Sequence, residues 1–226
     1  MTPSVQPPRV LLFDVNETLL DAGPLKDKIG DLLQDPSGGQ LWFTTMLHYA
    51  LVMSASGQYA PLPEIGVATL QMLARNSEVV LDAHEARQWV AGLRTLVPHP
   101  EVQPALERLR KAGLRMATLT NSSQDGLRAQ LQHAGLEDFF EKQLSVETVR
   151  KFKPDAAVYA WAAEQMGTAA GDCMLVVAHS WDVGGAKWGG MRTGFLARPQ
   201  QQLFPLAPAP DLDVADLAAL ARELGA

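Results

Sequence analysis

Three short apolar runs in the chain end at polar residues. They are RVLLFDV (residues 9–15), LRMATLTN (114–121) and CMLVVAH (173–179). Each run is rich in Val, Leu or Met and lacks the alternation of a strand that has one solvated face. The pattern therefore predicts three strands that are buried in a parallel sheet.

Segments with helical spacing of apolar residues separate and follow these runs. Residues 100–114, 122–136 and 153–167 each have a glycine near their carboxyl end, which is typical of a helix stop. A final amphipathic helix is expected at about 214–224, after a proline-rich connector. The alternation of strands and helices predicts an α/β protein with a doubly wound parallel sheet, a Rossmann-like core.

The segment 21–97 interrupts this alternation. It contains little strand signal, and Pro98 marks the return of the chain to the sheet. We therefore predict a core domain formed by 1–20 and 98–226, with residues 21–97 inserted as a helical cap domain. The helices expected within the cap are 41–57, 62–76 and 82–96.

Composition narrows the class of function. The 226-residue chain carries a net charge of −6 and its 19 Lys and Arg are scattered, which argues against a nucleic-acid partner. No stretch approaches the ~20 apolar residues of a membrane span, and the first residues lack the apolar core of a signal peptide. Cys173 is the single cysteine, so an intrachain disulfide is excluded. We expect a cytoplasmic protein with a small-molecule substrate.

Polar side chains follow each predicted strand. In open parallel sheets, ligands bind outside the carboxyl ends of the strands. A lysine also precedes the helix that leads to the third strand, so we expect all of these side chains to converge on one cleft. They are Asp14 after the first strand, Thr120 and Asn121 after the second, His179 and Asp182 after the third, and Lys153.

The order of four motifs, FDVNETL, TNSS, KPDAAVY and VVAHSWD, resembles the haloacid dehalogenase (HAD) superfamily, and within it the L-2-haloacid dehalogenase (type II) branch. The resemblance spans nearly the whole chain and places the helical insertion where that branch carries its cap. It implies an enzyme that needs no cofactor and displaces halide from a small 2-haloacid through an aspartyl ester.

The resemblance also implies roles for the residues of these motifs. Asp14 matches the nucleophile, and Lys153 matches the lysine that keeps it ionised. Asp182 would orient this lysine or help to activate water. Thr120 and Asn121 match residues that donate to the nucleophile and to the departing halide, although TNSS is also a good helix cap.

A second set of positions is expected to contact the substrate. Thr18 matches a motif hydroxyl, and Tyr159 matches the tyrosine of the KPDxxVY pattern. The structural alternatives are that Thr18 only stabilises a turn and that Tyr159 only packs in the core. The expected substrate-binding residues are Asn16, Thr18, Trp42, Phe43, Tyr159 and Trp181.

Two positions separate the chain from the phosphatases of the superfamily. Those enzymes carry a second aspartate two residues after the nucleophile, where this chain has Asn16, and an early acid in the last motif, where it has Ala178. An amide does not titrate in the useful range, and a halide leaving group needs no proton. Asp14 and Asp182 alone provide few oxygen ligands for Mg²⁺, so Mg²⁺ is expected only if the protein is a phosphatase.

Other positions depart from the dehalogenase branch. Phe43 occupies the place of an arginine that binds the substrate carboxylate, and Arg75, Arg87 or Arg94 would have to replace it. His179 also differs from the branch, and either positions or deprotonates the hydrolytic water or has only a structural role.

Three hypotheses follow from the sequence. The first is a dehalogenase, the second a magnesium-dependent small-molecule phosphatase, and the third a binding protein that kept the HAD fold without catalysis. The aromatic residues of 41–57 suit either a homodimer surface or packing inside the cap.

Overall fold

Six parallel strands form the central sheet of the protein, whose computed structural model describes residues 8–226. Residues 1–7, which the sequence analysis assigns to the core domain, lie outside the described residues. The strand order is β5-β4-β1-β6-β7-β8, so the predicted α/β class with a parallel sheet is confirmed. The strands are β1 (Val10–Phe13), β4 (Arg115–Thr120), β5 (Lys142–Ser145), β6 (Cys173–Val177), β7 (Arg192–Leu196) and β8 (Leu212–Val214).

The three strands predicted from the sequence lie together at the centre of the sheet. In register, Phe13 of β1 lies beside Thr118 of β4 and Val176 of β6. The carboxyl ends of the three strands are therefore level, and the polar residues that follow them emerge at the same edge. This register brings the candidate residues together.

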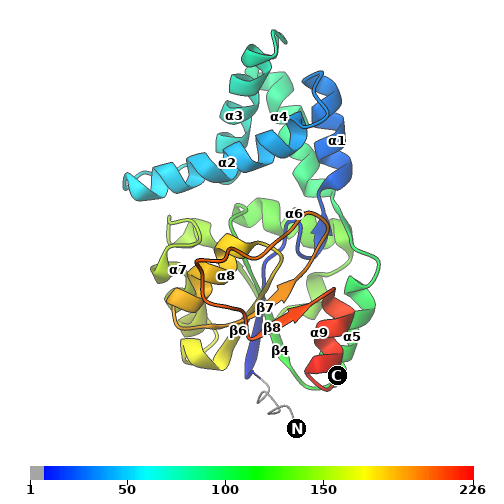
Figure 1. Cartoon of the computed structure of the whole chain (residues 1–226), viewed down its shortest axis with the longest axis vertical. Helices are drawn as coiled ribbons and strands as arrows, with labels where there is room; N and C mark the ends of the chain where they lie inside the picture. Colours follow the sequence, from blue (N-terminus) through cyan, green and yellow to red (C-terminus); the bar gives the residue numbers. More distant parts are fainter. Residues whose placement is uncertain (1–7) are drawn as a thin grey trace.

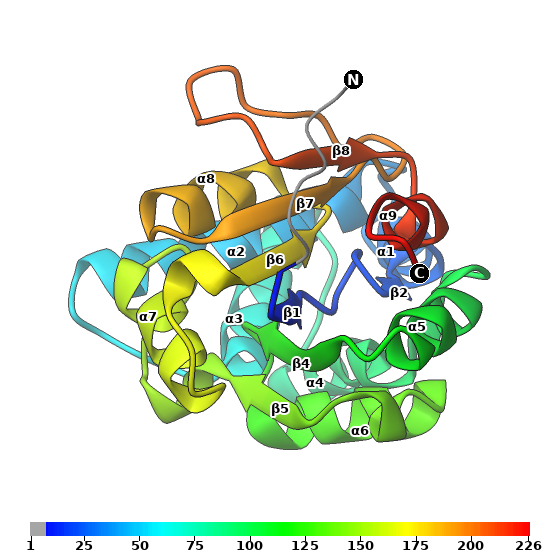
Figure 2. The same cartoon turned by 90° about the horizontal axis from the view of Figure 1, so that it is seen from below.

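Helices cover both faces of the sheet. Seen from below, α7 and α8 lie on one face, and α5 and α9 lie on the other (Figure 2). This arrangement is the doubly wound architecture that the alternation predicts. The core helices are α5 (Val102–Lys111), α6 (Gln124–Ala134), α7 (Ala156–Gln165), α8 (Ser180–Trp188) and α9 (Leu217–Glu223), with short 3-10 turns η2 (Glu137–Phe139), η3 (Val146–Thr148) and η4 (Ala170–Asp172).

A separate group of helices stands over the carboxyl ends of the strands (Figure 1). A short antiparallel ribbon of β2 (Leu20–Asp21) and β3 (Val97–Pro98) connects it to the core. The predicted domain boundaries fall in this ribbon, and we keep them as a proposal. The group consists of α1 (Gly23–Leu32), α2 (Gly38–Ala55), α3 (Leu62–Asn76), α4 (Ala83–Ala91) and η1 (Gly92–Thr95).

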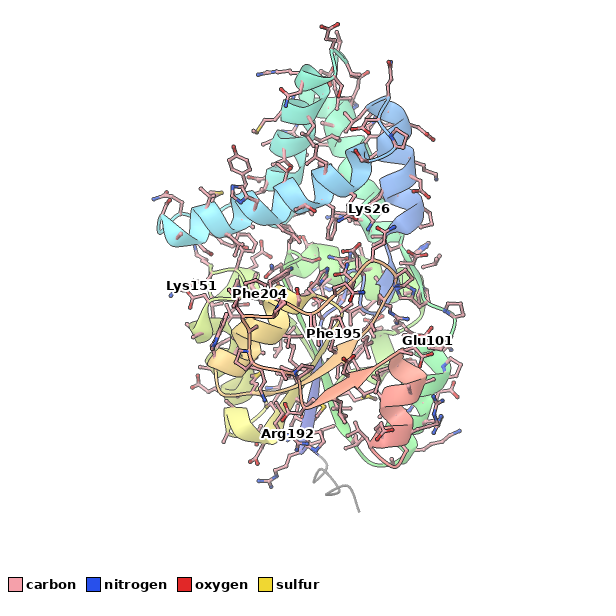
Figure 3. The ribbon with its side chains drawn as sticks, in the orientation of Figure 1. Lys26, Glu101, Lys151, Arg192, Phe195 and Phe204 are labelled. Atoms are coloured by element: carbon pink, nitrogen blue, oxygen red, sulfur yellow. The ribbon has the colours of Figure 1, made fainter. Side chains whose placement is uncertain are left out.

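Close packing within this helical region positions one side chain near the core. A Cβ atom on Gly39 of α2 would lie 1.8 Å from the carbonyl oxygen of Lys26, so only glycine allows α2 to pass α1 at this point. The contact directs the amino-terminal half of α1, including Lys26, toward the core (Figure 3). Within the described chain, no helix combines the length and apolarity that a bilayer-spanning segment requires.

Candidate active site

Asp14 and Lys153 form a buried ion pair at the carboxyl end of the sheet. Asp14 directly follows β1, and its Oδ1 lies 2.8 Å from Nζ of Lys153. Burial alone would raise the pKa of Asp14, but Lys153, together with His179, holds that pKa well below its usual range. Asp14 is therefore an ionised carboxylate at neutral pH.

Lys153 is anchored on several sides. Its Nζ also donates to the carbonyl oxygen of Leu119 at 2.9 Å and to Oδ2 of Asp182 at 2.6 Å, and its backbone N–H donates to Oδ1 of Asn121 at 3.0 Å. Burial opposes the charged form, but Asp14 and Asp182 raise the pKa of this lysine. The ammonium group is thus shared between two carboxylates.

Asp182 is held away from the substrate side by Tyr159. The phenol donates to Oδ1 of Asp182 at 2.5 Å while Lys153 binds Oδ2, so both oxygens are engaged. Burial, with the like charge of Asp14, raises the pKa of Asp182, and burial raises the pKa of Tyr159 well above its usual value. A Cβ atom on Gly185 of α8 would lie 2.5 Å from this phenol oxygen, so glycine is required for α8 to pack here.

Thr18 binds the second oxygen of Asp14. Its Oγ1 donates to Oδ2 at 2.7 Å and accepts from the backbone N–H of Ala178 at 3.0 Å. This bridge links the loop after β1 to the loop after β6. Thr18 is fully buried and therefore supports the carboxylate of Asp14 without being accessible to a ligand.

His179 lies between Asp14 and Glu17. Its Nε2 is 2.9 Å from Oε2 of Glu17, and its Nδ1 is 3.3 Å from Oδ2 of Asp14, a charge contact without good hydrogen-bond geometry. Its ring stacks between the aromatic rings of Phe43 and Trp181. Burial favours the neutral ring, but the two carboxylates outweigh it and raise the pKa of His179 to about 9. The resting site therefore holds an imidazolium, and the two roles expected for His179, in activating water or in structure alone, stay predictions.

Glu17 was not among the residues predicted from the sequence to form the site. It adopts a left-handed backbone conformation, with φ of 61°, which costs a residue other than glycine about 1 kcal/mol or more. Its carboxylate contacts both His179 and Lys26, and although burial opposes ionisation, these partners lower the pKa of Glu17. Its position three residues after Asp14 was the signal available in the sequence.

A cavity of about 350 Å³ opens between the helical region and the core at this site. It extends along α2 and reaches Lys153 and His179, two residues that contact Asp14. Asp14 itself is buried behind them and does not line the cavity. Among the predicted residues, Asn121, His179, Lys153, Phe43 and Trp181 line it.

Several predicted substrate contacts lie outside this cavity. Trp42 is fully buried in the helical region, where its Nε1 donates to the carbonyl oxygen of Gly66. Asn16 also points away from the cavity, donating to Oγ of Ser122 at 3.1 Å and accepting from Gln130 at 2.7 Å. Both side chains have their hydrogen bonds satisfied by protein, so the structure gives them supporting positions. The same holds for Thr18 and Tyr159, described above.

Thr120 also differs from its predicted role. Its Oγ1 accepts from the backbone N–H of Ser122 at 3.2 Å, so it shapes the turn after β4, and Thr18 donates to Asp14 instead. Asn121 faces the cavity, where the sequence analysis expects contact with a departing halide. A helix cap was the structural alternative for the TNSS motif, and Ser123 does cap α6, its Oγ accepting from the backbone N–H of Gly126 at 3.2 Å.

The arginines suggested as substitutes for the one replaced by Phe43 do not reach this cavity. Arg87 and Arg94 line a separate cavity of about 230 Å³ between α3, α4 and α6, and Arg75 is exposed on α3. The cation nearest to the Phe43 ring is Lys26 of α1, with Nζ 5.8 Å from the ring centroid.

The oxygen atoms at the site do not fit a magnesium ion. Both oxygens of Asp182 are bound by protein groups, and one oxygen of Asp14 is bound by the ammonium of Lys153, which leaves few free oxygen ligands. Residue 178, where the phosphatases carry an acid, is alanine, so its side chain supplies no carboxylate. Among residues 8–226 no group of three or more His, Cys, Asp or Glu side chains could hold a metal.

Comparison with known families agrees with this geometry. A family model for haloacid dehalogenase-like hydrolases matches residues 8–190. The (S)-2-haloacid dehalogenase of Pseudomonas sp. (strain YL) is 28% identical over 214 residues, which cover 93% of this chain and 91% of that protein. Haloacetate dehalogenase H-2 of Moraxella sp. (strain B) is 29% identical, over 90% of this chain and 92% of that protein.

A solved structure shares the whole architecture. The L-2-haloacid dehalogenase from Xanthobacter autotrophicus, with chloropropionic acid covalently bound, superposes with a TM-score of 0.88 and 25% identity. The match covers 95% of this chain and 97% of that chain, so the helical region and the sheet are both included.

Proposed function

Because the chain belongs to the haloacid dehalogenase-like hydrolase family, we propose that it is a hydrolytic dehalogenase that uses Asp14 as its nucleophile. Its substrate is a small 2-halogenated acid or a derivative of one. The observation that carries this proposal is the buried pair of Asp14 and Lys153, with an amide at residue 16 where a proton donor would be needed for phosphoryl transfer.

In the first step, a carboxylate oxygen of Asp14 attacks the carbon that bears the halogen. A carbon–oxygen bond forms while the carbon–halogen bond breaks, and the halide leaves with the bonding electrons. Lys153 and Thr18 hold the carboxylate in place, which lowers the entropic cost of the attack. The halide departs into the space lined by Asn121 and Trp181 and needs no proton.

In the second step, water attacks the ester carbonyl and releases a 2-hydroxy product, which regenerates Asp14. Ester formation removes the negative charge of Asp14, one of the two carboxylates that hold the proton on His179. The pKa of His179 therefore falls in the intermediate, and the ring releases its proton to solvent. The neutral ring can then accept a proton from the attacking water and pass it to the alkoxide that leaves as the 2-hydroxy product. Glu17, bonded to Nε2, keeps Nδ1 directed at the ester.

Halide release in the presence of EDTA tests this function. We expect bromide to be released from a 2-bromo acid or its amide without added metal, and no phosphate to be released from an aryl phosphate. Release of phosphate that requires Mg²⁺, with no halide from any substrate of the set, would identify a phosphatase instead.

A further inference from the structure

Glu17 connects two cations at one wall of the active-site cavity. Its Oε1 forms an ion pair with Nζ of Lys26, and its Oε2 lies 2.9 Å from Nε2 of His179. Nζ of Lys26 also donates to Oε1 of Gln40 at 2.7 Å. Neither cation is therefore available to a ligand without losing a partner within the protein.

Lys153, the remaining cation at the cavity, is also paired. It is held between Asp14 and Asp182, at 2.8 and 2.6 Å. The site thus contains three cations and three carboxylates before any substrate enters. If His179 is neutral, the net charge of the site becomes more negative. The conclusion that the site has no spare positive charge is therefore independent of that proton.

The neighbouring cavity offers no compensating charge. It has a volume of about 340 Å³ and shares Glu17, Gln40 and Gln201 with the first, so the two adjoin. It is lined by Asp21 and Asp27 as well as by Lys26 and Arg198. Arg198 is itself held by Glu101 at 2.7 Å and by the carbonyl oxygen of Thr18 at 2.8 Å.

An anionic substrate would therefore carry an unpaired charge to the inner end of the cavity, where Asn121, Lys153 and His179 are buried and an anionic carboxylate is already present. Moving an unpaired carboxylate out of water is strongly unfavourable. The cavity wall instead provides uncharged hydrogen-bonding groups, namely Gln40, Thr44, Asn121 and Gln201. Of its outer residues, Gln40, Thr44 and His48 are exposed to solvent. The carboxylate of Glu17, also on this wall, accepts hydrogen bonds and repels a second carboxylate.

We propose that Glu17 makes this protein selective for halogenated substrates whose anchoring group is an uncharged hydrogen-bond donor, such as a 2-halogenated carboxamide. The proposal rests on the proposed function, because it assigns the substrate class of the same Asp14 site. The amide N–H group of the substrate donates to Glu17, and the halogen-bearing carbon faces Asp14. The reaction is the one written above: halide leaves, water cleaves the ester, and a 2-hydroxy amide is released.

Two substrates of nearly equal shape test the proposal. Bromide release from (S)-2-bromopropionamide and from (S)-2-bromopropionate is measured with the unmodified protein, and kcat/KM values are compared after the uncatalysed rates are subtracted. We expect the amide to be preferred by about tenfold or more, since an uncompensated charge in such a site costs at least this factor. An equal or greater kcat/KM for the acid overturns the proposal while the dehalogenase function stands. Release of bromide from neither substrate overturns both.

The Glu17→Gln variant tests the residue itself. The substitution keeps the shape and frees Lys26 and His179 to face a substrate carboxylate, so the ratio of amide to acid kcat/KM should fall by about tenfold or more. Glu17→Gly, which suits the left-handed backbone, should shift the ratio in the same direction if the glutamine variant folds poorly. An unchanged ratio in the folded variants contradicts the assignment.

A matched control separates this effect from the substitution as such. Glu78 also has a left-handed backbone, with φ of 57°, and is exposed at the end of α3. Glu78→Gln should leave the ratio of the two substrates at its original value. A shift in this variant equal to that of Glu17→Gln would show that charge at the cavity is not the cause.

Discussion

Oε2 of Glu17 lies 2.9 Å from Nε2 of His179, and this contact joins the loop after β1 to the loop after β6. It fixes the imidazole so that Nδ1 faces Oδ2 of Asp14, while Phe43 and Trp181 stack on the ring. A histidine flanked by two carboxylates keeps its proton, so this contact sets the charge of the resting site.

The protonated state of His179 should appear in the pH dependence of stability. The pKa of the histidine is 6.5 in the unfolded chain and about 9 in the folded protein. Between these values the folded state binds a proton that the unfolded state lacks. The stabilisation is therefore complete below pH 6.5, declines as the pH rises, and is lost above about pH 9. It amounts to about 3 kcal/mol in the free energy of unfolding.

Denaturant unfolding from pH 6 to 10 measures this contribution as the difference between the original protein and His179→Gln. The difference should shrink as the pH rises through that range. His84→Gln, at an exposed position of α4, should give a difference that does not follow this course. A difference between the original protein and His179→Gln that is constant with pH would show that His179 is neutral in the folded state.

Removal of the ammonium group should affect both stability and activity. Lys153→Met leaves Asp14 and Asp182 buried beside each other without a cation, and the free energy of unfolding should fall by about 3 kcal/mol at neutral pH. The pKa of Asp14 rises in this variant, so halide release should fall at least about a hundredfold.

Lys151→Met is the matched control for this substitution. Lys151 lies two residues earlier, at the surface of the α7 side (Figure 3), where it pairs with Asp155. Its loss should change stability by less than about 1 kcal/mol. Retention of full halide release by Lys153→Met would refute the role of the ammonium group.

Tyr159 is a positioning residue, because it contacts Asp182 and does not line the cavity. Tyr159→Phe removes a hydrogen bond to a charged acceptor and should lower the free energy of unfolding by about 2 kcal/mol. The rate constant kcat should fall while KM stays unchanged, because Asp182 helps to hold Lys153. Tyr49→Phe, in the exposed part of α2, should change neither the free energy of unfolding nor kcat. A rise in KM without a change in kcat would place the phenol in contact with substrate instead.

Restoring an acid two residues after Asp14 should not create a phosphatase. Asn16→Asp loses the donor to Ser122 and places a second carboxylate beside the nucleophile, so the free energy of unfolding should fall by about 1 to 3 kcal/mol. Lys153 and Tyr159 would still bind the oxygens of Asp182. Phosphate release is measured with Mg²⁺ present, and Asn76→Asp at the end of α3 is the control for stability. Magnesium-dependent activity in Asn16→Asp would contradict the proposed inability of the site to hold a metal.

The centre of the fold follows from the sequence. The runs that became β1, β4 and β6 lack a polar face because both faces of these strands are covered, and in β4 only Arg115, at its start, is exposed. The outer strands were not predicted. β5 and β8 are short and partly exposed, and β7 contains a glycine. Helix α1 was also missed, because its charged residues weaken the apolar period.

The candidate site was only partly predictable, for a physical reason. The residues at strand ends, such as Asp14 and His179, could be placed together because parallel strands share one edge. Glu17 and Lys26 could not, because their meeting depends on how α1 packs against α2 at Gly39 and on the left-handed turn at residue 17. The aromatic stripe of α2 gave no way to tell that Trp42 packs inward while Phe43 faces the cavity.

The formation of an ester on Asp14 is tested most directly by isotope labelling. The protein is allowed to turn over a 2-bromo substrate many times in ¹⁸O-enriched water, and its peptides are then analysed by mass spectrometry. Because water attacks the ester carbonyl, ¹⁸O should enter the carboxylate of Asp14, and the peptide that contains Asp182 should stay unlabelled. Release of bromide with ¹⁸O in the product but none in Asp14 would show that water attacks the substrate directly, and that Asp14 is not the nucleophile.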